Sequence, residues 1–595
     1  MTVRAIAGLV VLNLVILGVG ASVLWGIRGW RWWSAFLRLA GLAYLVGVAS
    51  LTILLTLEVV LRIPFGLATF LASATLIAMG GVLVGALRGR SRPGLRPPRW
   101  RLGPPSLLTA AFAAAIALFL EALFRSTRLL PLFETDAWWV WTLRAKTLYF
   151  FGDLGPDTLV RATTLSYPPG LSLLHAAGFE AMGGPDTVTL HLQHWFFAVG
   201  FVAALVGLLL GRVRTAILLP FVLLTLVMPG FADRVNWAMA DPLLAYLVAI
   251  GGLQLYLWLE DRSRWRLESA TLLLGSAMLI KREGLILVLC VVAAALVASW
   301  GERRWAWPCV AAASGIALAL AAPWRIFLAA TGVRDAPTSG YLSFLDHPER
   351  ALPSLRLVLE TLFDPIWAGL GAIAVIALVL AFVAGERKLG AFGLTFLAAS
   401  VLGSAFVIWS ETAFEISQAP AVNPVIRMVL VTVLVVAPLV PLSLETAWRR
   451  GSPAGAPAVT RADHGRSRTG ARVTLAWAII GASLLLYPAS MAAGYSGLAL
   501  AGGAPRFPGP DECVLPATDA RNVRVVLGYR ETYADARALT ARARASGLNA
   551  TGVSLDDCGR LRVFLDDVPP GSAAGVVRAA RAAGFEASLE RDPDG

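Results

Sequence analysis

Residues 133–170 read FETDAWWVWTLRAKTLYFFGDLGPDTLVRATTLSYPPG, the first long polar stretch after four very apolar segments. The stretch opens with two carboxylates, Glu134 and Asp136, continues through a tryptophan-rich run, and closes on Tyr167 and a Pro-Pro-Gly sequence. A polar stretch of this length between apolar segments predicts a long loop at a membrane surface. The apolar segments around it decide the fold class.

The composition is that of a membrane protein. The chain has 595 residues, of which 57% are hydrophobic and 15% are charged, and its mean hydropathy is +0.70. A soluble protein of this length would not bury so much apolar surface. Segments of about 20 apolar residues are long enough to cross the hydrocarbon core of a bilayer. We therefore predict a polytopic α-helical membrane protein with about 13–14 transmembrane helices, near residues 5–26, 38–62, 66–88, 105–130, 187–211, 214–230, 239–259, 267–281, 284–300, 306–329, 366–385, 390–409, 425–446 and 473–495.

Basic residues alternate between the polar intervals. The net charge of +13 is typical of arginine-rich cytoplasmic loops that follow the positive-inside rule, and it gives no reason to expect a nucleic-acid partner. The basic clusters occupy alternate intervals, at 28–38, 88–101, 212–214, 262–266, 303–304, 386–388 and 449–472. The remaining intervals are then expected to face outward: 131–186, 231–238, 282–283, 330–365, 410–424 and everything after about residue 496.

The chain divides into a membrane part and a soluble tail. We predict N-terminal transmembrane helices (1–104), a membrane domain with the extracytoplasmic loop 131–186 (105–446), a cytoplasmic linker (447–472), a last transmembrane helix (473–495) and an extracytoplasmic domain (511–595). Arg-, Ala- and Gly-rich usage is typical of a GC-rich bacterial genome, and the first apolar segment has no small-residue cleavage site after it. We expect a multi-pass protein of a bacterial plasma membrane.

The tail predicts a small α+β domain. Strands are expected at 523–528, 550–555, 560–566 and 585–590, with helices at 532–546 and 571–583, and the related sequences ARASGLNA (543–550) and ARAAGFEA (580–587) each end a helix. This βαββαβ order predicts a ferredoxin-like fold, and it resembles the SPOR-type domains found outside bacterial membranes. Cys513 and Cys558 either form a disulfide in that oxidising compartment or remain two unpaired buried thiols.

The amphipathic run after Asp136 predicts an interfacial helix. Trp138 and Trp141 fall on one helical face together with Leu148, whereas Arg144 and Lys146 are polar. At the start of this helix, Asp136 is a candidate general base, with capping of the free helix amides as the alternative. Glu134 takes a supporting role.

An outward-facing site restricts the chemistry. Nucleotide sugars and ATP are cytoplasmic, so an enzyme that works outside needs an activated group delivered through the lipid, such as a polyprenyl-phosphate sugar. Transfer from such a donor needs a carboxylate base, cations for the departing phosphate and an apolar groove for the lipid chain. Candidate cations for the phosphate are Lys281 and Arg282, between two apolar segments, and Arg427, at the start of another. For Lys281 and Arg282 the alternative is a solvated turn with an internal ion pair. For Arg427 the alternative is a side chain that extends to the lipid headgroups.

The sequence resembles the GT-C superfamily of polyprenyl-phosphate-sugar glycosyltransferases. The blocks ETDAWWVWTLRAKTLYFFGDL (134–154) and YPPGLSLLHA (167–176) are similar to the branch of bacterial protein mannosyltransferases and lipid A sugar transferases. MADPLLAYL (239–247) and LIKREGLIL (279–287) resemble later motifs of that branch. The resemblance spans roughly residues 105–430. It implies an inverting glycosyltransferase with an extracytoplasmic acceptor, which is a glycan, a lipid or a protein of the cell envelope.

The resemblance also assigns residues. It implies Asp136 as the catalytic base, with Lys281, Arg282 and Arg427 as the candidate cations for the donor phosphate. The pocket is then expected to be completed by Glu134, Trp138, Arg144, Lys146, Tyr167 and Asp241. Asp241 has helix capping as its alternative role, because it precedes a proline at the first turn of a predicted helix.

Two other interpretations stay open. His191 and His194 are spaced to lie on one helical face and to hold a metal ion, but the sequence offers no evident third ligand, and a divalent cofactor remains unassigned. The rival function is a transporter or flippase for a lipid-linked glycan, which would need polar residues spread through the middle of several helices.

Overall fold

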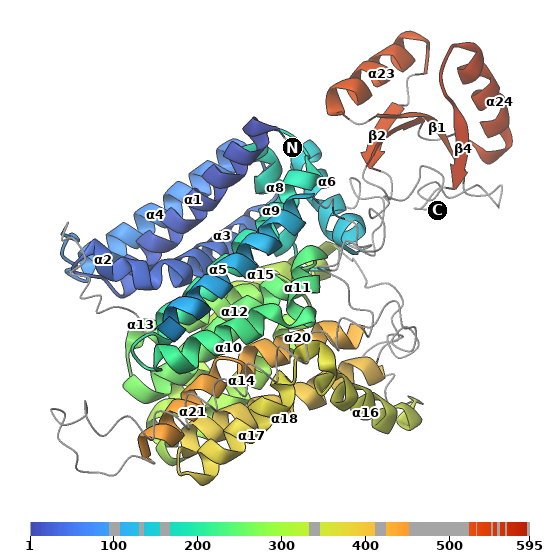
Figure 1. The fold of residues 1–595 in the computed structure, drawn as a ribbon. Helices are drawn as coiled ribbons and strands as arrows, with labels where there is room; N and C mark the ends of the chain where they lie inside the picture. Colours follow the sequence, from blue (N-terminus) through green and yellow to red (C-terminus); the bar gives the residue numbers. More distant parts are fainter. Residues whose placement is uncertain are drawn as a thin grey trace.

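The structure is a computed structural model, and it describes residues 2–94, 107–129, 132, 136–154, 167–331, 346–410, 424–450, 523–530, 532–548, 551–555, 560–565 and 568–591. These residues form a helical bundle and a small α/β unit near the C-terminus (Figure 1). The bundle is therefore the membrane part of the chain that the composition predicts.

The bundle is built from helices that run back and forth along one direction (Figure 1). In chain order the helices are α1 (Val3–Ile27), α2 (Trp33–Phe36), η1 (Leu37–Leu39), α3 (Ala40–Val60), α4 (Leu67–Leu87), α5 (Leu107–Leu129), η2 (Ala137–Thr142), α6 (Leu143–Phe151), α8 (Gly170–Met182), α9 (Thr187–Leu209), α10 (Thr215–Val227), α11 (Pro229–Asn236), α12 (Ala240–Asp261), α13 (Arg264–Ala277), α14 (Gly284–Ala298), η3 (Trp300–Glu302), α15 (Arg303–Thr331), η5 (Pro348–Arg350), α16 (Ala351–Leu362), η6 (Pro365–Trp367), α17 (Leu370–Val383), α18 (Arg387–Ser410), α20 (Pro424–Val436) and α21 (Leu439–Arg450).

Within the described residues, nine helices are long and apolar enough to cross a membrane, or ten if the bent pair α10 and α11 forms one span. The protein is thus a multi-pass helical membrane protein, but this part of the chain has fewer spans than the sequence predicts. The expected spans at 267–281, 284–300 and 366–385 correspond to α13, α14 and α17, which have only 14 or 15 residues. At 1.5 Å per residue such helices fall short of the hydrocarbon thickness. The expected last span, 473–495, and the linker before it lie outside the described residues.

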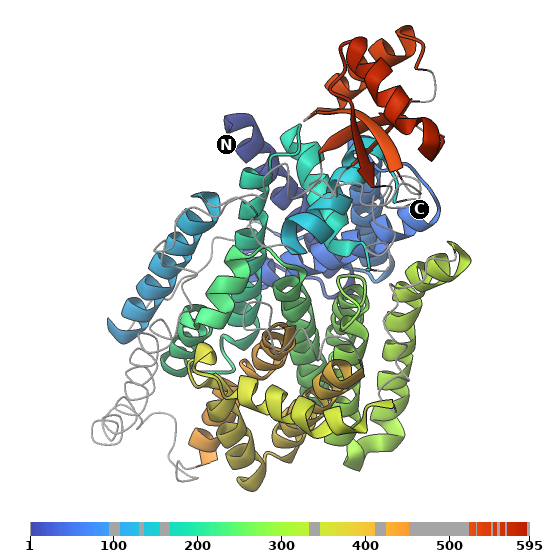
Figure 2. The same cartoon turned by 90° about the vertical axis from the view of Figure 1, so that its right-hand side faces the viewer.

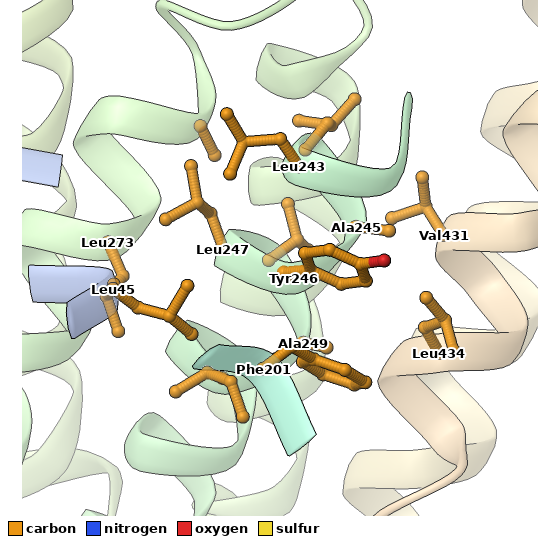
Figure 3. Close-up of a cluster of buried hydrophobic side chains, with 14 of the residues drawn as sticks. Leu45, Phe201, Leu243, Ala245, Tyr246, Leu247, Ala249, Leu273, Val431 and Leu434 are labelled. Atoms are coloured by element: carbon orange, nitrogen blue, oxygen red, sulfur yellow. The ribbon is translucent and has the colours of Figure 1, made fainter. Parts of the chain in front are cut away.

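Helix α12 lies at the centre of the bundle. Its apolar stretch is completely buried, and Figure 3 shows its residues Leu243, Tyr246 and Leu247 surrounded by side chains of α3, α9, α13 and α20. Tyr246 stacks on Phe201 of α9 with ring centroids 4.6 Å apart. Because α12 is held on all sides, the residues at its two ends have defined positions.

The loop 131–186 contains a helix that the sequence analysis did not separate from it. Helix α8 is buried along nearly its whole length and packs against α1 and α6. The backbones of α1 and α8 touch, since a Cβ added to Gly8 would lie 2.1 Å from the carbonyl oxygen of Ala181. The interval is therefore partly folded into the bundle, because residues 170–182 are mostly small or apolar.

The basic clusters of alternate intervals gather at one end of the bundle. Arg88 pairs with Glu268 at 2.8 Å, and Arg212 pairs with Asp261 at 2.8 Å and accepts a hydrogen bond on its carbonyl oxygen from Arg449. These ion pairs join residues from four separate intervals at the same end. The alternation predicted from the sequence therefore corresponds to a real separation of the two ends.

The C-terminal unit has the βαββαβ order predicted from the sequence. Its elements are β1 (Val523–Arg530), α23 (Tyr533–Ala545), β2 (Thr551–Leu555), β3 (Leu561–Leu565), α24 (Pro570–Ala582) and β4 (Ser588–Arg591). The strands lie in the order β2-β3-β1-β4, all antiparallel to their neighbours. This is the ferredoxin-like arrangement, so the prediction for this unit is confirmed. Cys513 and Cys558 lie outside the described residues.

The unit contacts the bundle at α6. Tyr533, the first residue of α23, lies with its ring centroid 6.0 Å from that of Phe150 and 5.9 Å from that of Phe151. Leu143 at the start of α6 belongs to the same apolar cluster as the core of the unit. Figure 2 shows the unit above the end of the bundle that carries α6.

Candidate functional site

Five charged side chains from four parts of the chain meet at the end of the bundle opposite to the basic intervals. We call them the ionic cluster, and they are Asp136, Asp241, Lys281, Glu283 and Arg427. Asp136 precedes η2, Asp241 lies in the first turn of α12, and Arg427 lies in the first turn of α20. Lys281 and Glu283 lie in the turn between α13 and α14.

Arg427 joins the two aspartates. Its Nη1 donates to Oδ2 of Asp136 at 2.6 Å, and its Nε donates to Oδ2 of Asp241 at 3.0 Å. The other oxygen of Asp241, Oδ1, accepts from Nζ of Lys281 at 2.7 Å, and Lys281 also lies 3.0 Å from Oε1 of Glu283. The cluster is therefore one connected chain of charges, in which the carboxylates and cations alternate.

The members of the cluster differ sharply in exposure. The side chains of Asp241 and Lys281 are 2% and 6% exposed, and that of Arg427 is 13% exposed. The side chain of Asp136 is 33% exposed. A buried charge is tolerated only when it is paired and hydrogen-bonded, so Asp241 holds the two cations in place. Asp136 is the more accessible of the two aspartates.

The structure agrees only in part with the alternative roles predicted for these residues. The side chain of Asp136 makes no capping hydrogen bond to η2, and both oxygens of Asp241 accept from Lys281 and Arg427. Lys281 does form the expected ion pair with Glu283, but it is buried and does not lie in a solvated turn. Arg427 is paired with two carboxylates at the start of a helix, where the helix dipole alone would disfavour a cation.

A close backbone contact attaches the end of the loop to the cluster. The amide of Gly170 donates to the carbonyl oxygen of Leu279 at 2.9 Å, and a Cβ at this glycine would lie 2.5 Å from the same oxygen. This contact places Tyr167 beside the Lys281 turn. The guanidinium carbon of Arg282 lies 4.4 Å from the centre of the Tyr167 ring, and Trp141 meets the same ring edge-on at 5.5 Å. Arg282, Tyr167 and Trp141 thus form a cation–aromatic group next to the cluster.

Helix α6 is not the interfacial amphipathic helix that the sequence predicts. The polar residues Arg144 and Thr147 of α6 are as buried as Leu148, because α8 packs on one side and the C-terminal unit contacts the aromatic end of α6. The preceding turn, η2, is π-helical. Such wide turns occur often at functional sites.

Arg144 is a buried cation with unused donors. It is fully buried, and its Nη1 donates to the carbonyl oxygen of Pro168 at 3.2 Å. Among the described residues its Nε and Nη2 have no hydrogen-bond partner, although the guanidinium carbon lies 5.8 Å from the centre of the Trp324 ring. Burial lowers the pKa of Arg144 to about 9, so the group stays charged at neutral pH. A buried cation of this kind is suited to receive an anion.

The other predicted pocket residues are less closely tied to the cluster. Trp138 lies partly exposed in η2, and Lys146 lies partly exposed on α6. Glu134 lies outside the described residues. Trp324 was missed by the sequence analysis, because it lies inside the apolar helix α15 and only the folded bundle brings it to Arg144.

A third histidine, His175, lies beside His191 and His194 in the structure. His175 of α8, which the sequence analysis did not consider, lies with Nε2 3.1 Å from Nε2 of His194. The ring of His191 is 6.4 Å from that of His194, centre to centre. Among the described residues, no group of three or more histidine, cysteine or acidic side chains has a geometry that could hold a metal ion.

The chain matches no protein-family model, no curated protein and no solved structure. Its function is therefore inferred from the geometry of the site.

Proposed function

We propose that this protein is an inverting membrane glycosyltransferase of the GT-C type, which moves a sugar from a polyprenyl-phosphate donor to an acceptor hydroxyl outside the cytoplasm. The observation that carries the proposal is the ionic cluster. It combines one accessible carboxylate, Asp136, with a buried cation, Lys281, and a partly buried one, Arg427, at the ends of membrane helices.

Each part of the reaction has a group suited to it. Asp136 removes the proton of the acceptor hydroxyl, and the oxygen then attacks the anomeric carbon of the donor sugar. The bond from that carbon to the phosphate oxygen breaks as the new bond forms, so the configuration at the anomeric carbon inverts. The departing lipid phosphate carries away the bonding electron pair, and Lys281, Arg282 and Arg427 stabilise its charge.

Ion pairs within the cluster compensate the charges of the two cations when no donor phosphate is bound. Asp241 and Glu283 neutralise Lys281, and Asp241 and Asp136 neutralise Arg427. A donor phosphate that approaches Arg427 competes with Asp136 for it. Donor binding thereby frees the Asp136 carboxylate from its ion pair and leaves it available to the acceptor hydroxyl.

The test is the substitution Asp136→Asn in the full-length protein. Membranes that contain each variant are supplied with lipid-linked sugars from the host envelope, and transfer to envelope acceptors is followed by mass analysis of the glycans. Loss of a general base is expected to lower transfer by about 10²–10⁴-fold. Asp153→Asn is the matched control, since Asp153 lies exposed just after α6. Transfer by Asp136→Asn at the rate of the unchanged protein would rule out this role for Asp136.

A transporter or flippase for a lipid-linked glycan is the second candidate, and one observation favours it. Polar side chains lie buried in the middle of α1, α3 and α9, where Asn13, Tyr44 and Gln193 form a hydrogen-bonded network with distances of 2.6 to 3.0 Å. These groups satisfy one another, as expected of helix-packing contacts in a membrane. Flipping of a lipid-linked glycan in proteoliposomes by Asp136→Asn, together with no transfer by the unchanged protein, would favour the transporter.

A further inference from the structure

A cavity of about 790 Å³ lies at the end of the bundle opposite to the ionic cluster. It is formed where α1, α2 and η1 meet the last turn of α9 and the first turn of α13. Its polar wall consists of four arginines, one serine and one tryptophan: Arg28, Arg38, Arg212, Arg266, Ser34 and Trp265. The rest of the wall is apolar or glycine, and no acidic residue from the described part of the chain lines it.

The cavity is far from the candidate active site. Helix α12 begins beside Asp241 of the ionic cluster and ends at Asp261, which pairs with Arg212 and Arg266 of the cavity. Twenty-two residues of α-helix separate the two ends, a length of about 33 Å at 1.5 Å per residue. The cavity therefore belongs to the other side of the membrane, and any ligand in it is distinct from a donor or acceptor at the ionic cluster.

Two of the four arginines have acidic partners. Arg212 pairs with Glu260 and Asp261, and Arg266 pairs with Asp261, each at 2.8 to 3.0 Å. These pairs use carboxylates that do not line the cavity. They fix the two guanidinium groups along one side of it.

The other two arginines keep their charge available. Within the described residues, the side chain of Arg28 donates to the carbonyl oxygen of Gly29, at 3.3 Å, and its guanidinium carbon lies 5.1 Å from the centre of the Trp265 ring. Its pKa is lowered by burial and then by the nearby Arg90, so positive charge is concentrated here. Arg38 is exposed and makes no hydrogen bond or ion pair with the part of the chain that the structure describes.

The surroundings of the cavity indicate the class of ligand. Guanidinium groups bind phosphate oxygens through pairs of parallel hydrogen bonds, and a volume of about 790 Å³ suits a polar group larger than one phosphate ion. Leu37 lines the cavity and is 58% exposed, and Trp33 of α2 beside it is 44% exposed. Exposed leucine and tryptophan at the ends of membrane helices are typical of contact with lipid at the bilayer interface. We propose that this cavity binds the phosphate of an anionic phospholipid headgroup.

Lipid binding by the purified full-length protein tests the proposal. The protein is placed in nanodiscs of phosphatidylcholine that contain an increasing fraction of phosphatidylglycerol, and retained lipid is measured by native mass spectrometry. Phosphatidylglycerol is expected to bind selectively. The double variant Arg28→Gln with Arg38→Gln is expected to bind it at least about tenfold more weakly, because two charge-assisted hydrogen bonds are removed.

The matched control is Arg264→Gln. Arg264 lies at the same end of the bundle and carries the same charge, but its side chain is 84% exposed and does not line the cavity. It should retain the lipid as the unchanged protein does. If Arg28→Gln fails to fold, Arg38→Gln alone is used, since Arg38 is exposed and its loss is expected to weaken binding about threefold or more.

Three results of this binding comparison would overturn the proposal. They are equal retention by the double variant and the unchanged protein, an equal loss in Arg264→Gln, and an absence of preference for phosphatidylglycerol over phosphatidylcholine. Glycerol 1-phosphate distinguishes the source of the phosphate: displacement of the lipid by this soluble ester at millimolar concentration would assign the cavity to a soluble ligand and reject the lipid.

Discussion

The substitution Asp241→Asn tests whether the ionic cluster is held together by its most buried member. Asp241 is 2% exposed, and its two oxygens accept from Lys281 at 2.7 Å and from Arg427 at 3.0 Å. Asparagine has nearly the same shape, but it lacks the negative charge and brings an NH₂ group against one of the two cations. The substitution therefore removes electrostatic compensation without opening a cavity.

The expected cost follows from these contacts. Removal of one partner from a buried ion pair costs about 3–5 kcal/mol, because the other charge is left uncompensated. Glu283 still lies 3.0 Å from Lys281, and Asp136 still lies 2.6 Å from Arg427. The two remaining carboxylates should keep the loss near the lower value, about 3 kcal/mol. In a chain of this size this corresponds to a decrease of about 2–3 °C in the midpoint of thermal unfolding.

Thermal unfolding of the purified full-length protein in detergent is the assay, and Asp136→Asn is the control. Asp136 pairs with the same arginine, but it is 33% exposed, so its substitution should change the midpoint by little, as for other exposed pairs. Lys281→Gln added to Asp241→Asn should cost less than the sum of the two single substitutions, since the two residues form one pair. An unchanged midpoint in Asp241→Asn, or an equal decrease in Asp136→Asn, would refute the reasoning.

Two further predictions concern packing. Gly20→Ala should lower the thermal midpoint, because a Cβ at Gly20 would lie 1.7 Å from the carbonyl oxygen of Ala43. Gly18→Ala is the control: nothing lies within 4 Å of its Cβ, so the midpoint should be unchanged or slightly raised. Equal effects of the two substitutions would contradict the close approach of α1 and α3. Tyr533→Ala should increase hydrogen exchange in α6 without unfolding the C-terminal unit, because Tyr533 contacts Phe150 and Phe151 at the end of that helix. Unaltered exchange in α6 would show that this contact does not protect the helix.

Local sequence patterns predicted most of the secondary structure. Apolar length identified most of the long helices, and the alternation of basic intervals separated the two ends of the bundle. In the tail, helix-ending glycines and short apolar runs predicted the observed βαββαβ order. These patterns show which segments are apolar enough to lie in a membrane. A segment there must satisfy its own backbone hydrogen bonds, so it is nearly always a helix.

The same patterns were less reliable for α6 and α8. Residues 143–151 have the spacing of an interfacial helix, yet Arg144 is completely buried. The residues of helix α8 were predicted to be part of a polar loop, although the helix packs directly on α1. The pattern of polar residues along a segment indicates which face of its helix would lie against a membrane. It does not show whether other parts of the protein cover the polar face.

The sequence by itself determined that this is a helical membrane protein, and it placed Asp136, Asp241, Lys281 and Arg427 at the ends of apolar segments. Only the tertiary structure decided that Arg427 bonds to Asp136, 291 residues away, and to Asp241, 186 residues away. It also decided which aspartate is buried and which is accessible. The physical reason is that burial and helix formation depend on neighbouring residues, whereas an ion pair depends on which helix ends are packed side by side.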